Sequence, residues 1–76
     1  MIIKHIEPKD NYILHITDEN NQSGLFDVAP YLNSEVFSQL KEQDNFKNIY
    51  NGKYYIEWDC GADLSADTIE AKWQKQ

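Results

Sequence analysis

The chain has 76 residues, of which 13 are acidic and 7 are basic, so its formal net charge is −6 at pH 7. All the basic residues are lysines and they are scattered, whereas nucleic-acid binding draws on clustered lysine and arginine; we therefore expect no direct contact with nucleic acid. This length predicts a single domain, 1–76, with a core too small for a large buried pocket.

The N-terminal third predicts three strands. MIIKHIE alternates apolar and polar side chains up to Pro8, which predicts a strand at about 1–7 that the proline stops. NYILHIT places Leu14 and Ile16 on one face, and the short PKDN link predicts an antiparallel hairpin. After the polar turn DENNQ, the run SGLFDV at 23–28 is extended again. A three-stranded meander is the simplest arrangement of these strands.

The next segment predicts a helix. Ser34 is a good N-cap, and Val36, Phe37 and Leu40 would share one helical face. We therefore predict a helix at about 34–43.

The segment after it predicts a second hairpin. Asn51 and Gly52 lie between two runs rich in β-forming residues, and this pair is typical of a two-residue type I′ turn. The pattern predicts strands at about 46–50 and 53–58.

The segment WDCGADLSADTIE is expected to join the last strand to a final helix. Gly61 gives the backbone freedom to leave the strand sharply, and Ser65 can cap the helix. Leu64 lies just before the cap, where it can pack against Ile69. We expect Trp58 and Leu64 to be buried and to fasten the strand to the helix.

Taken together, the elements predict an α+β fold. The expected architecture is a small antiparallel sheet of about five strands in the order β-β-β-α-β-β-α, with two helices packed on one face.

The run WDCGADLSADTI also resembles a family of small bacterial proteins, the domain of unknown function numbered twenty-four forty-two. The family pattern is Trp, a short loop, Gly-Ala-Asp-Leu, Ser or Ala, Pro and Asp-Thr-Leu. The matching positions are Trp58, Gly61, Ala62, Asp63, Leu64, Ser65, Asp67 and Thr68. The chain departs at Ala66, where the family has proline, and at Ile69, where leucine is typical. Upstream, Phe37, Leu40 and Phe46 also fit, so the resemblance covers nearly the whole chain.

This resemblance implies a small α+β fold with an antiparallel sheet and helices on one side, and it implies no established activity. Some relatives look like antitoxin partners of a second small protein. Others carry an added helix-turn-helix domain, which we expect to be absent here because the chain ends at Gln76.

The residues offer little support for a metal site or an enzyme. The carboxylates that could bind a metal are Glu57, Asp59, Asp63, Asp67 and Glu70. They lack the regular spacing of a calcium loop, so we expect no metal and no cofactor. Cys60 could act with His5 or His15, but it is flanked by Asp59 and Asp63 and not by a basic group that would favour the thiolate, so we expect no enzyme.

Protein binding fits the composition better. We expect a small, acidic, non-enzymatic, antitoxin-like module whose protein partner has a basic surface. The carboxylates expected to contact it are Asp59, Asp63, Asp67 and Glu70. The candidate aromatic anchors are Tyr31, Tyr50, Tyr54, Tyr55 and Trp73. Two alternatives remain open: the acidity only keeps the protein soluble, or the loop 59–63 serves a small-molecule site, a metal site or a weak enzyme.

The expected location is the cytoplasm. A single cysteine cannot form an internal disulfide, and the start MIIKHIEPKD lacks the apolar stretch of a signal peptide. No apolar run approaches the roughly 20 residues of a membrane helix, so we expect no membrane contact.

Overall fold

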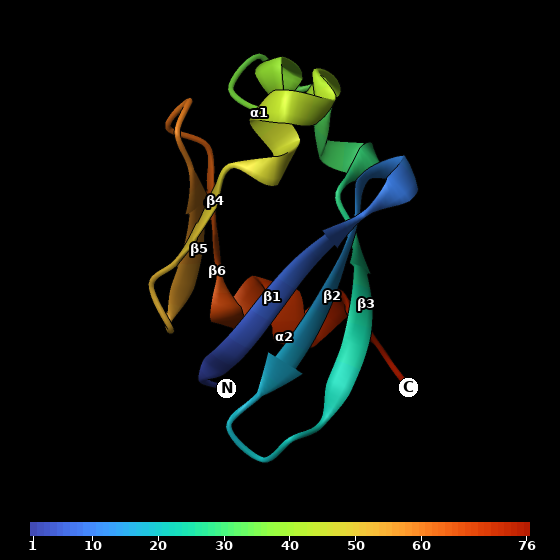
Figure 1. Ribbon diagram of the computed structural model, residues 1–76, viewed down its shortest axis with the longest axis vertical. Coiled ribbons are helices and arrows are strands. Elements are labelled where there is room, and N and C mark those ends of the chain that lie inside the picture. Colours follow the sequence, from blue (N-terminus) through green and yellow to red (C-terminus); the bar gives the residue numbers. More distant parts are fainter.

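Seven strands form two antiparallel sheets on opposite sides of the computed structural model, which describes residues 1–76 (Figure 1). The first sheet has the order β1-β2-β3-β7 and the second has the order β4-β5-β6. The strands of the first sheet are β1 (Ile3–Lys9), β2 (Ile13–Asp18), β3 (Ser23–Asp27) and β7 (Gln74–Lys75). Those of the second are β4 (Ile49–Asn51), β5 (Tyr55–Trp58) and β6 (Asp63–Ser65).

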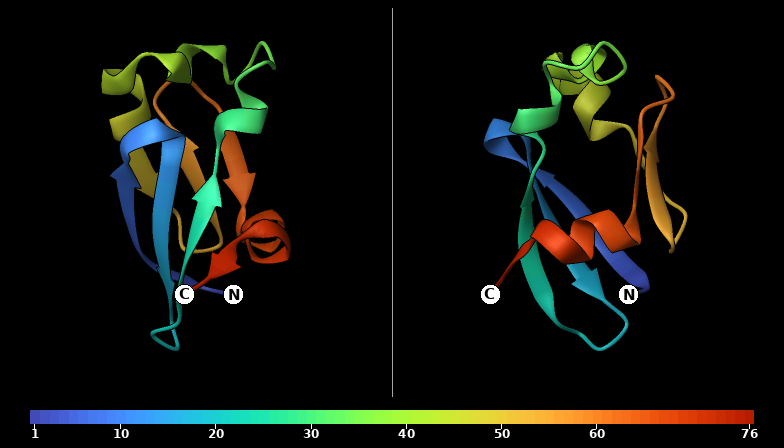
Figure 2. Two further views of the ribbon diagram at one scale, coloured as in Figure 1. Left: turned by 90° about the vertical axis from the view of Figure 1, so that its right-hand side faces the viewer. Right: turned by 180° about the vertical axis from the view of Figure 1, so that it is seen from behind.

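Helical segments complete the fold. Short 3-10 turns and α1 (Gln43–Lys47) lie over one end of the two sheets, and α2 (Ala66–Lys72) crosses from β6 toward β3 (Figure 2). The 3-10 turns are Asp10–Tyr12, Ala29–Tyr31 and Ser38–Lys41. No helix has both the length and the apolar character that crossing a membrane requires.

The predicted α+β class with antiparallel pairing is confirmed, but the strands do not form one sheet with both helices on one face. The sheets meet at one corner, where the Ile3 N–H donates to the Lys53 carbonyl at 2.8 Å. The Asn51 side-chain amide donates to the Ile3 carbonyl there at 3.0 Å. Away from this corner the sheets diverge, and apolar side chains fill the space between them.

The predicted meander is confirmed, because β1 pairs with β2 and β2 pairs with β3. The predicted stop at Pro8 is wrong, since β1 continues to Lys9 and Pro8 lies opposite Leu14. β1 is an edge strand. Proline has no N–H to donate, and an edge strand tolerates it because one side of the strand has no partner strand that needs a hydrogen bond. A proline therefore does not end a strand in this position.

The predicted helix at 34–43 is wrong, because this segment forms successive 3-10 turns. The Phe37 N–H donates to the Ser34 carbonyl and the Leu40 N–H to the Phe37 carbonyl, both three residues back. In this geometry residues three apart share a side, so Leu40 is buried below Phe37 whereas Val36 is 57% exposed. The Ser38 hydroxyl also donates to the Glu35 carbonyl at 2.8 Å, which competes with regular helical bonding.

The second hairpin is present, but its predicted boundaries and turn type are wrong. The strand predicted at 46–50 begins only at Ile49, because Phe46 belongs to α1. The positive φ of the turn falls on Lys53, at 71°, and not on Gly52. The Tyr54 N–H donates to the Gly52 carbonyl at 2.8 Å, which closes a three-residue turn.

The segment after Trp58 contains a strand that the sequence did not predict. Gly61 has φ 96°, and its N–H donates to the Trp58 carbonyl at 2.9 Å, so the chain folds back into β6. The cap at Ser65 is confirmed, since its hydroxyl oxygen accepts the Thr68 N–H at 3.1 Å. The chain therefore runs from strand to strand to helix, and the predicted strand-to-helix joint includes a tight hairpin.

The core contains fifteen buried hydrophobic residues from both sheets and from the helical segments. Trp58 is 1% exposed, and its Nε1 donates to the Phe46 carbonyl at 2.9 Å. The predicted burial of Trp58 and Leu64 is confirmed. Trp73 is the residue after α2, and its ring packs on Gly24 of β3. This contact holds α2 against the first sheet.

Candidate functional site

The four carboxylates expected to contact a partner are all exposed, but they occupy two separate places. Asp59 lies in the turn after β5, and Asp63 lies on β6. Asp67 and Glu70 lie on α2, where Glu70 Oε1 accepts a hydrogen bond from the Met1 ammonium at 2.9 Å. This bond raises the pKa of the Met1 amine above its ordinary value, so Glu70 is already engaged within the chain.

The outer face of the second sheet gathers tyrosines and carboxylates from three strands. Side chains of successive strand residues alternate between the two faces of a sheet. Ile56, Trp58 and Leu64 point into the core, so their neighbours point outward. We call these outward residues the tyrosine–carboxylate face: Tyr50, Tyr55, Glu57, Asp63 and Ser65.

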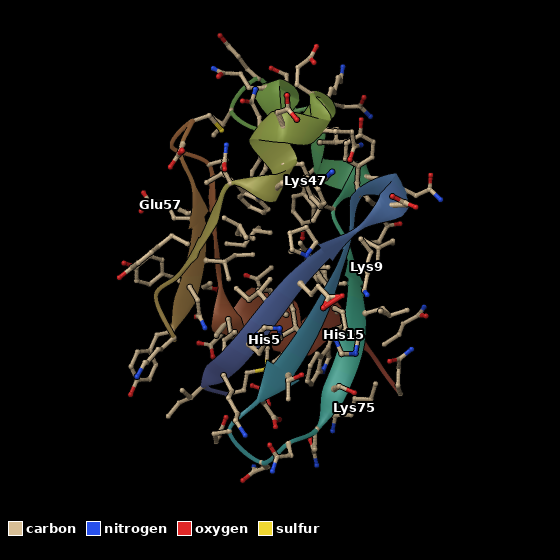
Figure 3. All side chains as sticks on the ribbon, in the orientation of Figure 1. His5, Lys9, His15, Lys47, Glu57 and Lys75 are labelled. Atoms are coloured by element: carbon tan, nitrogen blue, oxygen red, sulfur yellow. The ribbon has the colours of Figure 1, made fainter.

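The strand register sets the neighbours on this face. Tyr50 lies opposite Glu57, and Glu57 lies opposite Asp63, so one ring and two carboxylates form a row across the sheet. Tyr55 lies opposite Ser65 in the adjoining row. Figure 3 shows Glu57 pointing outward from the sheet, and no helix covers this side of the molecule.

The two tyrosines are exposed and close together. Tyr50 is 61% exposed and Tyr55 is 41% exposed, and their ring centroids are 6.4 Å apart with an interplanar angle of 51°. Tyr54, in the adjoining turn, is 66% exposed. Tyrosine is enriched in protein interfaces and among the few residues that carry most of the binding energy.

The turn before β5 holds the Tyr55 ring in place. A methyl group built on Gly52 would collide with the ring atoms of Tyr55, so the ring lies directly against the glycine backbone. The Asn51 side-chain oxygen accepts a hydrogen bond from the Lys53 N–H at 2.7 Å, and this bond stabilises the turn that contains Gly52. Glycine at 52 is therefore explained by contact with the ring and not by a positive φ.

Comparison with known proteins gives the family. The family model described as "Protein of unknown function (DUF2442)" matches residues 3–75. The chain belongs to this family. The match confirms the resemblance seen in the sequence and covers both sheets and both helices of the DUF2442 fold. No curated protein and no solved structure matches the chain.

The other residues considered for chemistry are not brought together in this DUF2442 protein. His5 and His15 lie on the outer face of the first sheet (Figure 3), whereas Cys60 is a half-buried free thiol beside the second sheet. The Glu7 carboxylate pairs with the Lys9 ammonium, which lowers the pKa of Glu7. No three His, Cys, Asp or Glu side chains are grouped so that they could hold a metal ion.

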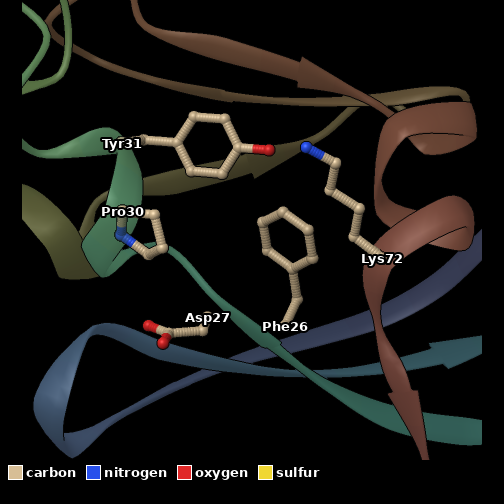
Figure 4. A pocket seen from close by; sticks show the side chains of 5 residues that line it. All are labelled: Phe26, Asp27, Pro30, Tyr31 and Lys72. Carbon is tan, nitrogen blue, oxygen red and sulfur yellow. The ribbon is translucent and has the colours of Figure 1, made fainter.

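The hollows on the surface lie away from the loop at 59–63. The largest, of about 410 Å³, is lined by Phe26, Asp27, Pro30, Tyr31 and Lys72 (Figure 4). Lys72 reaches from α2 toward Tyr31, and its Nζ lies 5.9 Å from the ring centroid. Two smaller hollows, of about 270 and 200 Å³, are lined by other residues outside that loop.

The sequence did not reveal that Glu57 and the tyrosines share one surface. The sequence indicates Glu57 only as a possible metal ligand, because nothing in it predicts β6 or the neighbours of Asp63 across the sheet. The alternation of Tyr55, Ile56, Glu57 and Trp58 carried the signal, since it places Tyr55 and Glu57 on the side opposite two core residues.

Proposed function

We propose that the chain is a non-enzymatic protein-binding module that uses the tyrosine–carboxylate face to dock on the basic surface of a second protein. In this proposal it acts in the bacterial cytoplasm in the manner of an antitoxin that neutralises a small toxin. The observation that carries it is the pair of exposed tyrosines beside two cross-strand carboxylates, on a sheet face that no helix covers.

Two physical effects support docking by this face. The tyrosine rings offer rigid area that a partner can bury at small entropic cost. The carboxylates of Glu57 and Asp63 lie on a chain whose net charge is −6, so a positively charged partner is attracted before contact. Asp59 extends the same negative region at the turn between β5 and β6, whereas Asp67 and Glu70 on α2 form a separate patch.

The test measures how fast a partner captured from the native cell associates with the protein. Raising the salt from about 0.01 to about 1 M shortens the Debye length from roughly 30 to roughly 3 Å, so association is expected to slow strongly while dissociation changes less. The variant Glu57→Gln/Asp63→Asn is expected to reproduce part of this slowing at low salt, in stopped-flow measurements.

A matched control is Glu35→Gln/Glu42→Gln, which removes the same charge from exposed positions in the helical segment. We expect this control to slow association less than the change on the sheet. Equal effects of the two variants would overturn the assignment of the face, and salt-independent association would mean that the acidity serves only solubility.

A further inference from the structure

We infer that the tyrosine–carboxylate face selects arginine over lysine on the surface it binds. This inference rests on the proposed function and specifies the chemistry of the partner. It depends on two features that occur together on the face, namely aromatic rings open to solvent and carboxylates in the neighbouring strand positions.

The first feature suits the flat surface of a guanidinium group. Arginine stacks on the face of a tyrosine ring and keeps its N–H groups free to point sideways. The Tyr50 and Tyr55 rings are tilted by 51° relative to each other and their centroids are 6.4 Å apart, so two aromatic rings lie side by side on this face. Contact with Gly52 restrains the Tyr55 ring in this arrangement, so little ordering is needed on binding.

The second feature suits the N–H groups of the same guanidinium. Glu57 lies directly opposite Tyr50, so a guanidinium stacked on the ring can donate two parallel hydrogen bonds to that carboxylate. Asp63 is the next residue in the row and offers a further acceptor. Lysine carries a compact, strongly hydrated ammonium that cannot combine flat stacking with a two-pronged hydrogen bond.

The composition of the chain fits this selectivity. All seven basic residues of the protein are lysines, so none of its own side chains offers the group that the face prefers. A second copy of the chain therefore competes poorly with an arginine-bearing partner. The absence of arginine from the chain itself thus helps the face to discriminate against a second copy of the same protein.

The experiment compares two short peptides that differ only in their basic residue. One alternates arginine with glycine and the other alternates lysine with glycine, so their length and charge are the same. Each is titrated into the full chain at low salt, and the backbone amide signals of β4, β5 and β6, which every variant retains, are followed by NMR. We expect the arginine peptide to bind more tightly, by about two- to fivefold for each stacked arginine.

Three variants separate ring stacking from charge. Tyr50→Phe/Tyr55→Phe keeps the rings and should retain the preference for arginine. Tyr50→Leu/Tyr55→Leu keeps apolar bulk and should bind the two peptides equally. Glu57→Gln should reduce the preference, whereas Glu42→Gln should leave it unchanged.

Equal affinity of the unchanged protein for both peptides would overturn the selectivity and leave the proposed function standing. An arginine preference that survives the leucine variant would also overturn it, since the rings would not be its source. Absence of binding by either peptide, together with salt-independent association of a captured partner, would overturn the proposed function itself.

Discussion

Replacing Trp58 with alanine is expected to lower the free energy of unfolding by about 3–5 kcal/mol, the range of large aromatic truncations in protein cores. Trp58 is 1% exposed, and its ring packs edge-to-face on Phe37 at 6.1 Å and stacks on Phe46 at 6.2 Å. A single domain has a total stability of only about 5–15 kcal/mol and one of this length lies toward the lower end, so the variant should lose much of its stability. Urea denaturation followed by circular dichroism measures the change.

A Trp58→Phe variant serves as the control for this prediction. It keeps an aromatic ring in the core but removes the indole N–H that donates to the Phe46 carbonyl. The buried carbonyl then lacks this donor, and we expect a smaller loss of about 1–3 kcal/mol. If the alanine variant melted within a few degrees of the parent, Trp58 could not be the residue that joins the second sheet to α1.

Gly24→Ala is expected to lower the free energy of unfolding by about 1–3 kcal/mol, because a larger side chain would overpack a tight contact. A methyl group at this position would lie 2.8 Å from the Trp73 ring and 2.8 Å from the Gln74 carbonyl oxygen. The chain after α2 must then move away from β3, which also weakens the pairing of β7. Denaturation, together with the fluorescence of Trp73 in a Trp58→Phe background, measures both effects.

Gly61→Ala is the matched comparison, because a methyl group there meets nothing within 4 Å. Its cost comes only from the φ of 96°, so it should leave Trp73 fluorescence unchanged. A Gly24→Ala protein with unchanged fluorescence and stability would show that Trp73 does not pack on β3.

The elements that the sequence predicted well depend on local patterns. Alternation of apolar residues around Leu14, Ile16 and Phe26 gave the meander, because each strand buries one face. Ser65 gave the start of the last helix, because its cap involves only the next three residues. Strands and helix starts predicted from local periodicity and capping are therefore present in the structure where no distant contact favours another conformation.

The elements that the sequence missed depend on distant contacts. The 3-10 turns around Phe37 place its ring against Trp58, some twenty residues further along the chain. An α-helix would have brought Val36 to the same buried side as Phe37 and Leu40, whereas Val36 is 57% exposed here. β6 exists because Asp63 pairs with Glu57, and β7 exists because Gln74 pairs with Leu25. A strand of two or three residues carries too little periodicity to be recognised by itself.

The candidate face was missed for the same reason. Asp63 was expected to contact a partner, but its neighbours Glu57 and Tyr50 become apparent only once the order of β4, β5 and β6 is known. Asp67 and Glu70 seemed to belong with Asp63 because they are close in sequence. Asp63 lies on β6, whereas Asp67 and Glu70 lie on α2, where the Met1 ammonium binds Glu70.

The most direct measurement is NMR mapping of the isotope-labelled protein with the partner captured from its native cell. We expect the largest changes in amide and ring signals at Tyr50, Tyr55, Glu57 and Asp63, with little change around His5 and His15 on the opposite sheet. Changes confined to the opposite sheet or to the hollow at Lys72, with the signals of Tyr50 and Tyr55 unmoved, would contradict docking by the tyrosine–carboxylate face.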